Sequence, residues 1–325
     1  MPARQALTLE AQQEAVTRLG AGFLLVAGLA ALAGCTAPSS SEIRISALTA
    51  LDLAQGERPK VAASTTIVAD VLARVGGDDI DLTTTLPPGA DPHEFEPTPR
   101  EIEALSQADV LFISGLGYEM ILQRTLSQAG LAPATVALSE GLESDVDPAE
   151  DPHVWLDPRN VMLWVDNAAR ALGALDPAHA EVYSARAAAY RAELEALDLR
   201  LESLVEDVPQ GERKIVADHQ ALGHLAARYG LEIVGSLIPG PSDAAEPSAR
   251  SLAELQATMQ VEGIHVILLT SLENQSLAER VAADTGARLV RLYVESLGDA
   301  GGPADSYIGL MEYNLAAISD ALNSP

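Results

Sequence analysis

Short apolar segments alternate with amphipathic ones along most of the chain. The apolar runs have the length of buried strands, and the segments between them carry apolar residues at helical spacing. In the first half, the expected strands are 60–66, 80–86, 110–113 and 135–138, and the expected helices are 67–75 and 98–108. Short buried strands that alternate with helices predict an α/β fold whose sheet is parallel and flanked by helices.

The pattern changes at Asp176, where a long helical segment is predicted. After Pro177 no glycine or proline occurs before Pro209, and the apolar residues follow a 4-3-4-3 spacing. They are Tyr183, Ala187, Tyr190, Leu194, Leu197, Leu201 and Leu204. Asp176 suits the N-cap and Pro177 the first helical position. Such a helix, about 45 Å long, exceeds one small lobe, so we expect it to run along two lobes rather than form a coiled coil.

The alternation resumes after Pro209 and completes a two-lobed arrangement. The expected strands are 215–217, 231–234, 266–269 and 288–292, and the expected helices are 221–229, 251–262, 276–285 and 307–322. The sequence therefore predicts an N-terminal α/β lobe (58–175), a linking helix (176–209) and a C-terminal α/β lobe (210–325), each lobe with a mostly parallel sheet.

The N-terminal residues have the features of a secretion signal. Residues 19–33 are apolar and uncharged and follow Arg18, and they fall short of the ~20 residues that span a bilayer. The sequence Leu-Ala-Gly-Cys, ending at Cys35, resembles the bacterial lipobox, whose cysteine is lipidated and becomes the new N-terminus. We expect a signal peptide (1–34), a tether (35–57) and export to the outer face of the membrane. An ordinary secretory signal with an incidental cysteine is the alternative.

Composition limits the possible partners and excludes internal disulfide bonds. Cys35 is the sole cysteine, which excludes an intramolecular disulfide, and the formal net charge is −27 at pH 7. This charge argues against a nucleic-acid partner, which requires a basic surface. An acidic surface by itself most often provides solubility. We expect the exported protein to be a monomer.

The tripeptide Asp-Pro-His occurs twice and carries the candidate chemistry. Proline restricts the backbone on both sides of itself, so the imidazoles of His93 and His153 are directed by stiff segments. His219 and Glu295 follow strands in the second half, as the other two follow strands in the first, and open α/β sheets bind ligands past the ends of their strands. The separations of 60, 66 and 76 residues match no local zinc motif, so the four residues form one site only if the lobes face each other.

Longer motifs surround these residues in a fixed order: Pro88–Pro97, Asp151–Pro158, His219–Gly223, Glu246–Ser248, Glu295–Gly298 and Tyr307–Met311. In this order they resemble the substrate-binding lipoproteins of bacterial ABC transporters for zinc and manganese, from about residue 59 to 322. The resemblance implies two lobes joined by one long helix, with a single metal ion in the interlobe cleft. It implies His93, His153, His219 and Glu295 as ligands, an ABC permease and its ATPase as partners, and no enzymatic activity.

The ligand types favour zinc as the cargo. Three imidazoles and one carboxylate suit zinc, whereas manganese prefers more oxygen ligands. A Glu295 that binds through both oxygens would bring the site closer to manganese. Relatives more often have aspartate at this position, and many have glutamate where this chain has Thr270, a difference for which we expect no direct effect on the metal.

Two other functions fit parts of the sequence. A metal-dependent hydrolase could use three histidines with an open position on zinc, and its base would be Asp91 or Glu94, although no HExxH motif occurs. An adhesin, acting in cell adhesion, or a metal chaperone could use the same scaffold, but no feature specifies a host ligand. We expect His179, His224 and His265 to lie outside the site, and the acidic segment 140–151 to be a solvated loop.

Overall fold

The computed structural model describes residues 42–90, 92, 95–149, 151–238, 247–271 and 274–324, which contain two parallel sheets. The first sheet has the order β2-β1-β3-β4, with β1 (Lys60–Ala63), β2 (Asp81–Thr84), β3 (Val110–Ile113) and β4 (Thr135–Ala137). The second has the order β6-β5-β7-β8, with β5 (Lys214–Ala217), β6 (Glu232–Ser236), β7 (Val266–Leu269) and β8 (Arg288–Arg291). Every strand pairing is parallel, which confirms the predicted fold class.

Most helices also lie where the sequence predicts them. They are α1 (Thr66–Gly76), α2 (Pro99–Ser106), α6 (Gly223–Tyr229), α7 (Ala249–Glu262), α8 (Gln275–Thr285) and α9 (Tyr307–Leu322). Short 3-10 turns occur at η1 (Ile45–Ala47), η2 (Gly77–Asp79), η3 (Val154–Leu156) and η4 (Gln210–Glu212). None of the described helices combines the length and apolar character needed to cross a bilayer.

Two helices were not predicted, α3 (Met120–Gln128) and α4 (Pro158–Leu175). The start of α4 is marked in the sequence, because the Asp157 side chain caps it and Pro158 occupies its first turn. Its remaining surface is mostly buried, from Val161 to Leu172. Asp166 and Arg170 lie on its less buried side while Val161, Val165 and Leu172 are buried, so an amphipathic period is present in the sequence of this helix.

The long helix α5 (Ala180–Glu206) starts later than predicted. Asp176 does not cap it; the carboxylate of Asp176 instead contacts His179 Nδ1 at 2.6 Å and accepts a hydrogen bond from the Tyr183 hydroxyl at 3.0 Å. At the other end Val205 is buried and Leu204 is only half-buried. A straight helix of 3.6 residues per turn drifts away from a strict seven-residue repeat, which explains this change of face.

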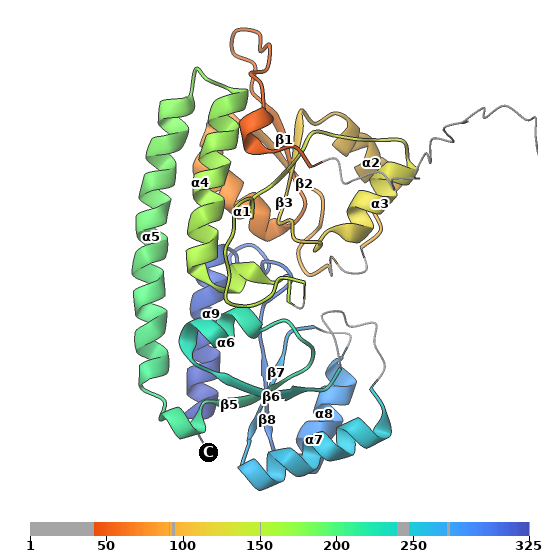
Figure 1. Cartoon of the computed structure of the whole chain (residues 1–325), viewed down its shortest axis with the longest axis vertical. Coiled ribbons are helices and arrows are strands. Elements are labelled where there is room, and N and C mark those ends of the chain that lie inside the picture. The colour runs from red at the N-terminus through yellow and green to blue at the C-terminus, as the bar shows by residue number, and fades with distance from the viewer. Residues whose placement is uncertain are drawn as a thin grey trace, which may run out of the picture. The chain divides into compact units, whose positions relative to one another are not determined.

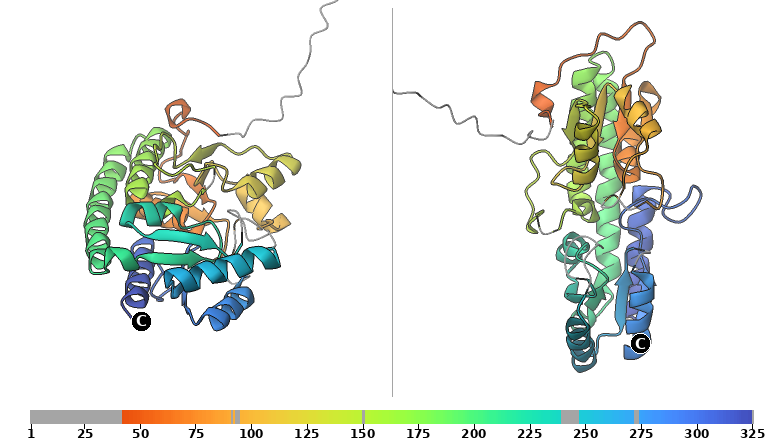
Figure 2. Two further views of the ribbon diagram at one scale, coloured as in Figure 1. Left: turned by 60° about the horizontal axis from the view of Figure 1, so that its bottom comes forward. Right: turned by 90° about the vertical axis from the view of Figure 1, so that its right-hand side faces the viewer.

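Helix α5 runs alongside both sheets (Figure 1 and Figure 2). It packs on α1 of the first lobe and on α9 of the second. One continuous cluster of buried side chains extends from Ile67 on α1 through Leu194 on α5 to Leu310 on α9. Smaller clusters fill the outer faces, around Leu111 in the first sheet and Ile267 in the second. The lobes therefore share a core instead of having two separate ones.

A buried ion pair ties α5 to α6. The Asp198 carboxylate lies 2.7 Å from Arg228 Nη2 and accepts a hydrogen bond from the Tyr229 hydroxyl at 3.0 Å. The side chains of Arg228 and Asp198 are only 13% and 10% exposed. Because α6 follows the segment that carries His219, this pair helps to fix the position of that segment.

The loop between β3 and α3 is closed by the buried carboxylate of Glu119. Glu119 accepts hydrogen bonds from the Ser114 and Gly115 N–H groups, at 2.6 and 3.1 Å, and from the Ser64 hydroxyl at 2.8 Å. Leu116, between two glycines, has a φ of 58°, a left-handed conformation that non-glycine residues seldom adopt. Burial raises the pKa of Glu119 to about 7, although its hydrogen bonds act in the opposite direction.

We expect Asp198→Ala to destabilise the protein by about 3 kcal/mol, because it leaves the largely buried Arg228 guanidinium with only the more exposed carboxylate of Glu202 as a partner. Chemical denaturation of the metal-free protein measures the free energy of unfolding. Glu195→Ala on the same helix is the control. Glu195 pairs with Arg191, but their side chains are 56% and 41% exposed, so the expected loss of stability is below about 1 kcal/mol. Equal losses in both variants would contradict the structural role of Asp198.

The raised pKa of Glu119 predicts a pH-dependent contribution to stability. Glu119 stays protonated in the folded state up to about pH 7, and in the unfolded state only up to about 4.5. Its contribution is thus complete below pH 4.5 and decreases as the pH rises to 7, by about 3 kcal/mol. Glu119→Gln lacks this titration, so the stability of the native protein relative to the variant should fall across this interval. If the unfolding free energies of the native protein and of Glu119→Gln changed with pH in the same way, folding would not raise the pKa of Glu119.

Candidate metal centre

Three side chains predicted from the sequence converge at one point between the lobes. His153, His219 and Glu295 each offer one ligand atom, and these atoms lie within 4.8 Å of one another. Glu295 Oε1 is 3.2 Å from His153 Nε2 and 3.6 Å from His219 Nε2. The three residues are 0%, 1% and 7% exposed. The described residues contain no second group of this kind.

His153 is held by the acid that precedes it in its motif. It follows the acidic segment after β4 and directly precedes η3. Asp151 Oδ1 accepts a hydrogen bond from the His153 backbone N–H at 3.0 Å and lies 2.8 Å from its ring Nδ1. A carboxylate contact at Nδ1 leaves Nε2 directed at the centre of the site. The rings of Tyr118 and Trp155 pack edge-on against the imidazole, with centroids 5.5 and 5.2 Å away.

His219 lies immediately past the end of β5 and is oriented through Thr270. The Thr270 Oγ1 lies 2.9 Å from His219 Nδ1 and donates to Asp218 Oδ1 at 2.7 Å. Asp218 is fully buried and also accepts from the backbone N–H groups of Thr270 and Ser271, at 2.9 and 3.0 Å. Thr270 thus contacts a candidate ligand, an indirect role that the sequence did not reveal.

Glu295 comes from the segment after β8 and is held by residues of the first lobe. The Tyr118 hydroxyl donates to Glu295 Oε2 at 2.7 Å. The Trp155 indole N–H donates to the Val294 carbonyl at 3.0 Å, and the Leu297 N–H donates to the Thr66 hydroxyl at 2.8 Å. Hydrogen bonds on both sides of Glu295 therefore cross from one lobe to the other.

The buried charges of the site change the pKa values of both imidazoles. Burial lowers the pKa of His153, but the carboxylates of Glu295 and Asp151 outweigh it and raise the value to about 9. Burial also lowers the pKa of His219, and Asp218 and Glu295 raise it to about 11. Each imidazole therefore holds its proton more strongly than a free one and must lose it before Nε2 can bind a metal ion.

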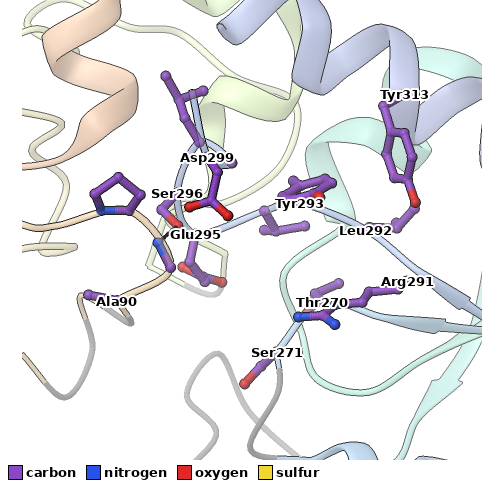
Figure 3. Close-up of a pocket in the computed structure, with 15 residues that line it drawn as sticks. Ala90, Thr270, Ser271, Arg291, Leu292, Tyr293, Glu295, Ser296, Asp299 and Tyr313 are labelled. Atoms are coloured by element: carbon purple, nitrogen blue, oxygen red, sulfur yellow. Dashed lines mark hydrogen bonds between the residues drawn. The ribbon is translucent and has the colours of Figure 1, made fainter. Parts of the chain in front are cut away.

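A cavity of about 420 Å³ opens beside Glu295, as Figure 3 shows. Its walls come from Pro88–Ala90 on one side and from Thr270, Ser271 and the segment Arg291–Asp299 on the other. His93 lies outside the described residues, as do Asp91 and Glu94, so its predicted role as the fourth ligand stays a prediction. Cys35, the predicted lipidation site, also lies outside the described residues.

The remaining histidines are not in this cluster. His224 is buried and lies 2.9 Å from the Asp151 carbonyl, His179 contacts Asp176, and His265 lies 3.4 Å from the Gly263 carbonyl. The acidic segment 140–151 is largely exposed up to residue 149, but Asp151 is 5% exposed and belongs to the site.

Sequence reasoning missed the residues that orient the candidate ligands. Asp151 stands two positions before His153, and this spacing is a signal that could have identified it. Tyr118 and Thr270 gave no such signal, since they are 177 and 51 residues away from the residues they contact.

Comparison with known proteins identifies the family. The family described as "zinc-uptake complex component A periplasmic" matches residues 61–321. A manganese-binding lipoprotein, MntA of Halalkalibacterium halodurans, is 30% identical over 279 residues, which cover 82% of this chain and 90% of that protein. The iron ABC transporter substrate-binding lipoprotein MtsA of Streptococcus pyogenes is 29% identical over 282 residues, covering 83% and 90%.

A solved structure agrees with this assignment. The periplasmic zinc-binding protein TroA of Treponema pallidum aligns with a TM-score of 0.74 and 28% identity, covering 82% of this chain and 99% of that one. The family consists of transporter components and not of enzymes, which argues against the hydrolase alternative. With its two parallel-sheet lobes and its match from residue 61 to 321, the chain belongs to the zinc-uptake component A family, the substrate-binding proteins of metal ABC transporters, which work with a permease and an ATPase.

Proposed function

We propose that the protein captures one divalent transition metal ion outside the cytoplasmic membrane, zinc in preference to manganese, and delivers it to its permease. The ligands in this proposal are His93 and His153 from the first lobe and His219 and Glu295 from the second. The observation that carries the proposal is the convergence of His153, His219 and Glu295 at one buried point.

The ligand geometry supports a binding protein. Both imidazoles present Nε2 to the same carboxylate oxygen, while each Nδ1 contacts a side chain outside the cluster. Four protein ligands with no position reserved for water are typical of sites that hold zinc without catalysis. A buried site also favours transport over adhesion, which requires an exposed surface.

The contact between Tyr118 and Glu295 supports zinc over manganese. The Tyr118 hydroxyl donates to Oε2 of Glu295, and the other oxygen, Oε1, lies near both imidazoles. A carboxylate that binds through one oxygen, together with three imidazoles, gives the four-coordinate N/O shell that suits zinc. Manganese prefers additional oxygen ligands. The named relatives include manganese-, iron- and zinc-binding proteins, so the family alone does not decide the metal.

The proposal extends to the attachment of the protein. Relatives named as lipoproteins support lipidation at Cys35 and a position on the outer face of the membrane. We propose that residues 35–57 tether the body there as a monomer, from which a single bound ion reaches the permease.

Alanine substitution of His153, His219 or Glu295 should weaken zinc binding by two or more orders of magnitude, because each variant removes one of four ligands. Competitive titration against a chelator of known affinity measures the change. His265→Ala is the control, since His265 lies outside the cluster. Affinity near that of the native protein in all three variants would refute this site.

Tyr118→Phe should shift selectivity toward manganese by roughly tenfold, because it frees Oε2 of Glu295 from a hydrogen bond worth about 1.5–3 kcal/mol. The measurement is the ratio of the zinc and manganese dissociation constants, each from a competitive titration. Tyr313→Phe is the matched control, since Tyr313 lines the adjacent cavity and should leave the ratio unchanged. An unaltered ratio in Tyr118→Phe would show that Tyr118 does not set the coordination mode.

A further inference from the structure

The carboxylate of Asp151 connects the two segments that carry His153 and His219. Its Oδ1 contacts the backbone N–H and ring Nδ1 of His153, at 3.0 and 2.8 Å. Its Oδ2 accepts a hydrogen bond of 2.7 Å from the backbone N–H of Gly223, the first residue of α6. Since α6 begins four residues after His219, one side chain bridges the ligand segments of the two lobes.

Gly223 has no room for a side chain at this contact. A Cβ built on Gly223 would lie 2.7 Å from Asp151 Oδ2 and 3.3 Å from Val146 Cγ1. The backbone of Gly223 is helical, so an alanine there would press on the carboxylate without straining its own conformation. The glycine is therefore required for the close approach of Asp151 to α6.

His224 makes a second connection to the same residue. Its Nε2 lies 2.9 Å from the Asp151 carbonyl oxygen, which can only accept, so Nε2 carries the proton. Its Nδ1 lies 3.3 Å from the Ser144 hydroxyl. Both nitrogens of His224 are thus engaged, and α6 holds the acidic segment at Ser144 and at Asp151.

The structure leaves space for these contacts to open. A cavity of about 280 Å³ lies beside them and is lined by Asp151, His219, Gly223 and Ile233, among others. Close-packed interiors resist such separation. The contact between Asp151 and Gly223 borders this cavity, so its surroundings are less closely packed than a protein interior.

We propose that Asp151 is a positioning residue that couples the two halves of the metal site and thereby limits the rate of metal release. With the contact made, His153 is oriented and the segments of His153 and His219 are held together. With the contact broken, the two imidazoles can separate and the ion leaves toward the permease. This inference rests on the proposed function, because it assumes that His153 and His219 bind the cargo.

The proposal assigns different effects to the two oxygens of Asp151. Partners that orient a metal-bound histidine typically contribute 10–100-fold to metal affinity. Loss of the link to α6 should act mainly on dissociation, because it removes a restraint on separation of the ligands while their chemistry stays the same. Variants that break only the hydrogen bond between Asp151 and Gly223 therefore separate the link between the two segments from the orientation of His153.

The experiment measures zinc release from the loaded full chain after stopped-flow mixing with excess chromogenic chelator. Asp151→Asn can still accept from His153 through its oxygen, but it then presents an amide donor to the Gly223 N–H. Gly223→Ala leaves Asp151 in the chain and displaces its Oδ2. We expect both variants to release zinc about tenfold faster than the native protein, and Asp151→Ala to release it up to about 100-fold faster.

Two controls distinguish this role from general effects. Asp145→Asn removes the same charge from an exposed position in the acidic segment, and its release rate should stay native. Bound Co²⁺ reports the ligand set through its visible absorption spectrum, which should be unchanged in Gly223→Ala. A purely structural defect would instead alter the spectrum or lower the thermal stability of the metal-free protein without faster release.

The outcomes separate the proposal from the function on which it rests. Native release rates in both Asp151→Asn and Gly223→Ala would overturn the coupling role, as would equal acceleration by Asp145→Asn. If the native chain binds zinc and His219→Ala does not, the assignment of the metal site stands, whichever result the Asp151 variants give. If His219→Ala binds zinc normally, the proposed site itself fails.

Discussion

The carboxylate of Glu295 is shared between the two lobes, and the geometry of the site depends on that arrangement. One oxygen accepts a hydrogen bond from Tyr118 of the first lobe, and the other faces His153 of the first lobe and His219 of the second. Because the site is buried, these charged contacts are strong, and a charged group left without its partner would destabilise the fold. The relative position of the lobes is therefore a condition for the site, and the shared core along α5 provides it.

Each of the three candidate ligands that the structure describes is held by its own supporting contacts. Asp151 contacts His153, Thr270 and Asp218 orient His219, and Tyr118 holds Glu295. Tyr118 is in turn placed by a loop that closes on the buried Glu119. Such supports set the direction of the ligand atoms before any ion arrives, which raises affinity and restricts geometry. The Asp151 carboxylate contacts His153 and also accepts a hydrogen bond from Gly223, so it touches the segments of two candidate ligands at once.

The sequence predicted the sheets because they follow from local patterns, and similar patterns indicated the candidate ligands. Short buried runs such as Val110–Ile113 mark strands, and His219 and Glu295 were recognised because each stands just past a strand. The sequence interpretation missed α4, although its cap and its helical period stand in the sequence, and it misplaced the start of α5, where Asp176 makes other contacts. It also missed Tyr118 and Thr270, since their roles arise from contacts between distant parts of the chain. Such contacts depend on the packing of the lobes and leave no local pattern.

X-ray absorption at the zinc edge of protein loaded with one equivalent of metal tests the central claim most directly. The account predicts four nitrogen or oxygen ligands at about 2.0–2.1 Å, with the outer-shell scattering of three imidazoles. It predicts the loss of one imidazole from that pattern in His153→Ala and in His219→Ala. A six-coordinate shell of oxygen atoms, or a spectrum that neither substitution changes, would contradict the interlobe site.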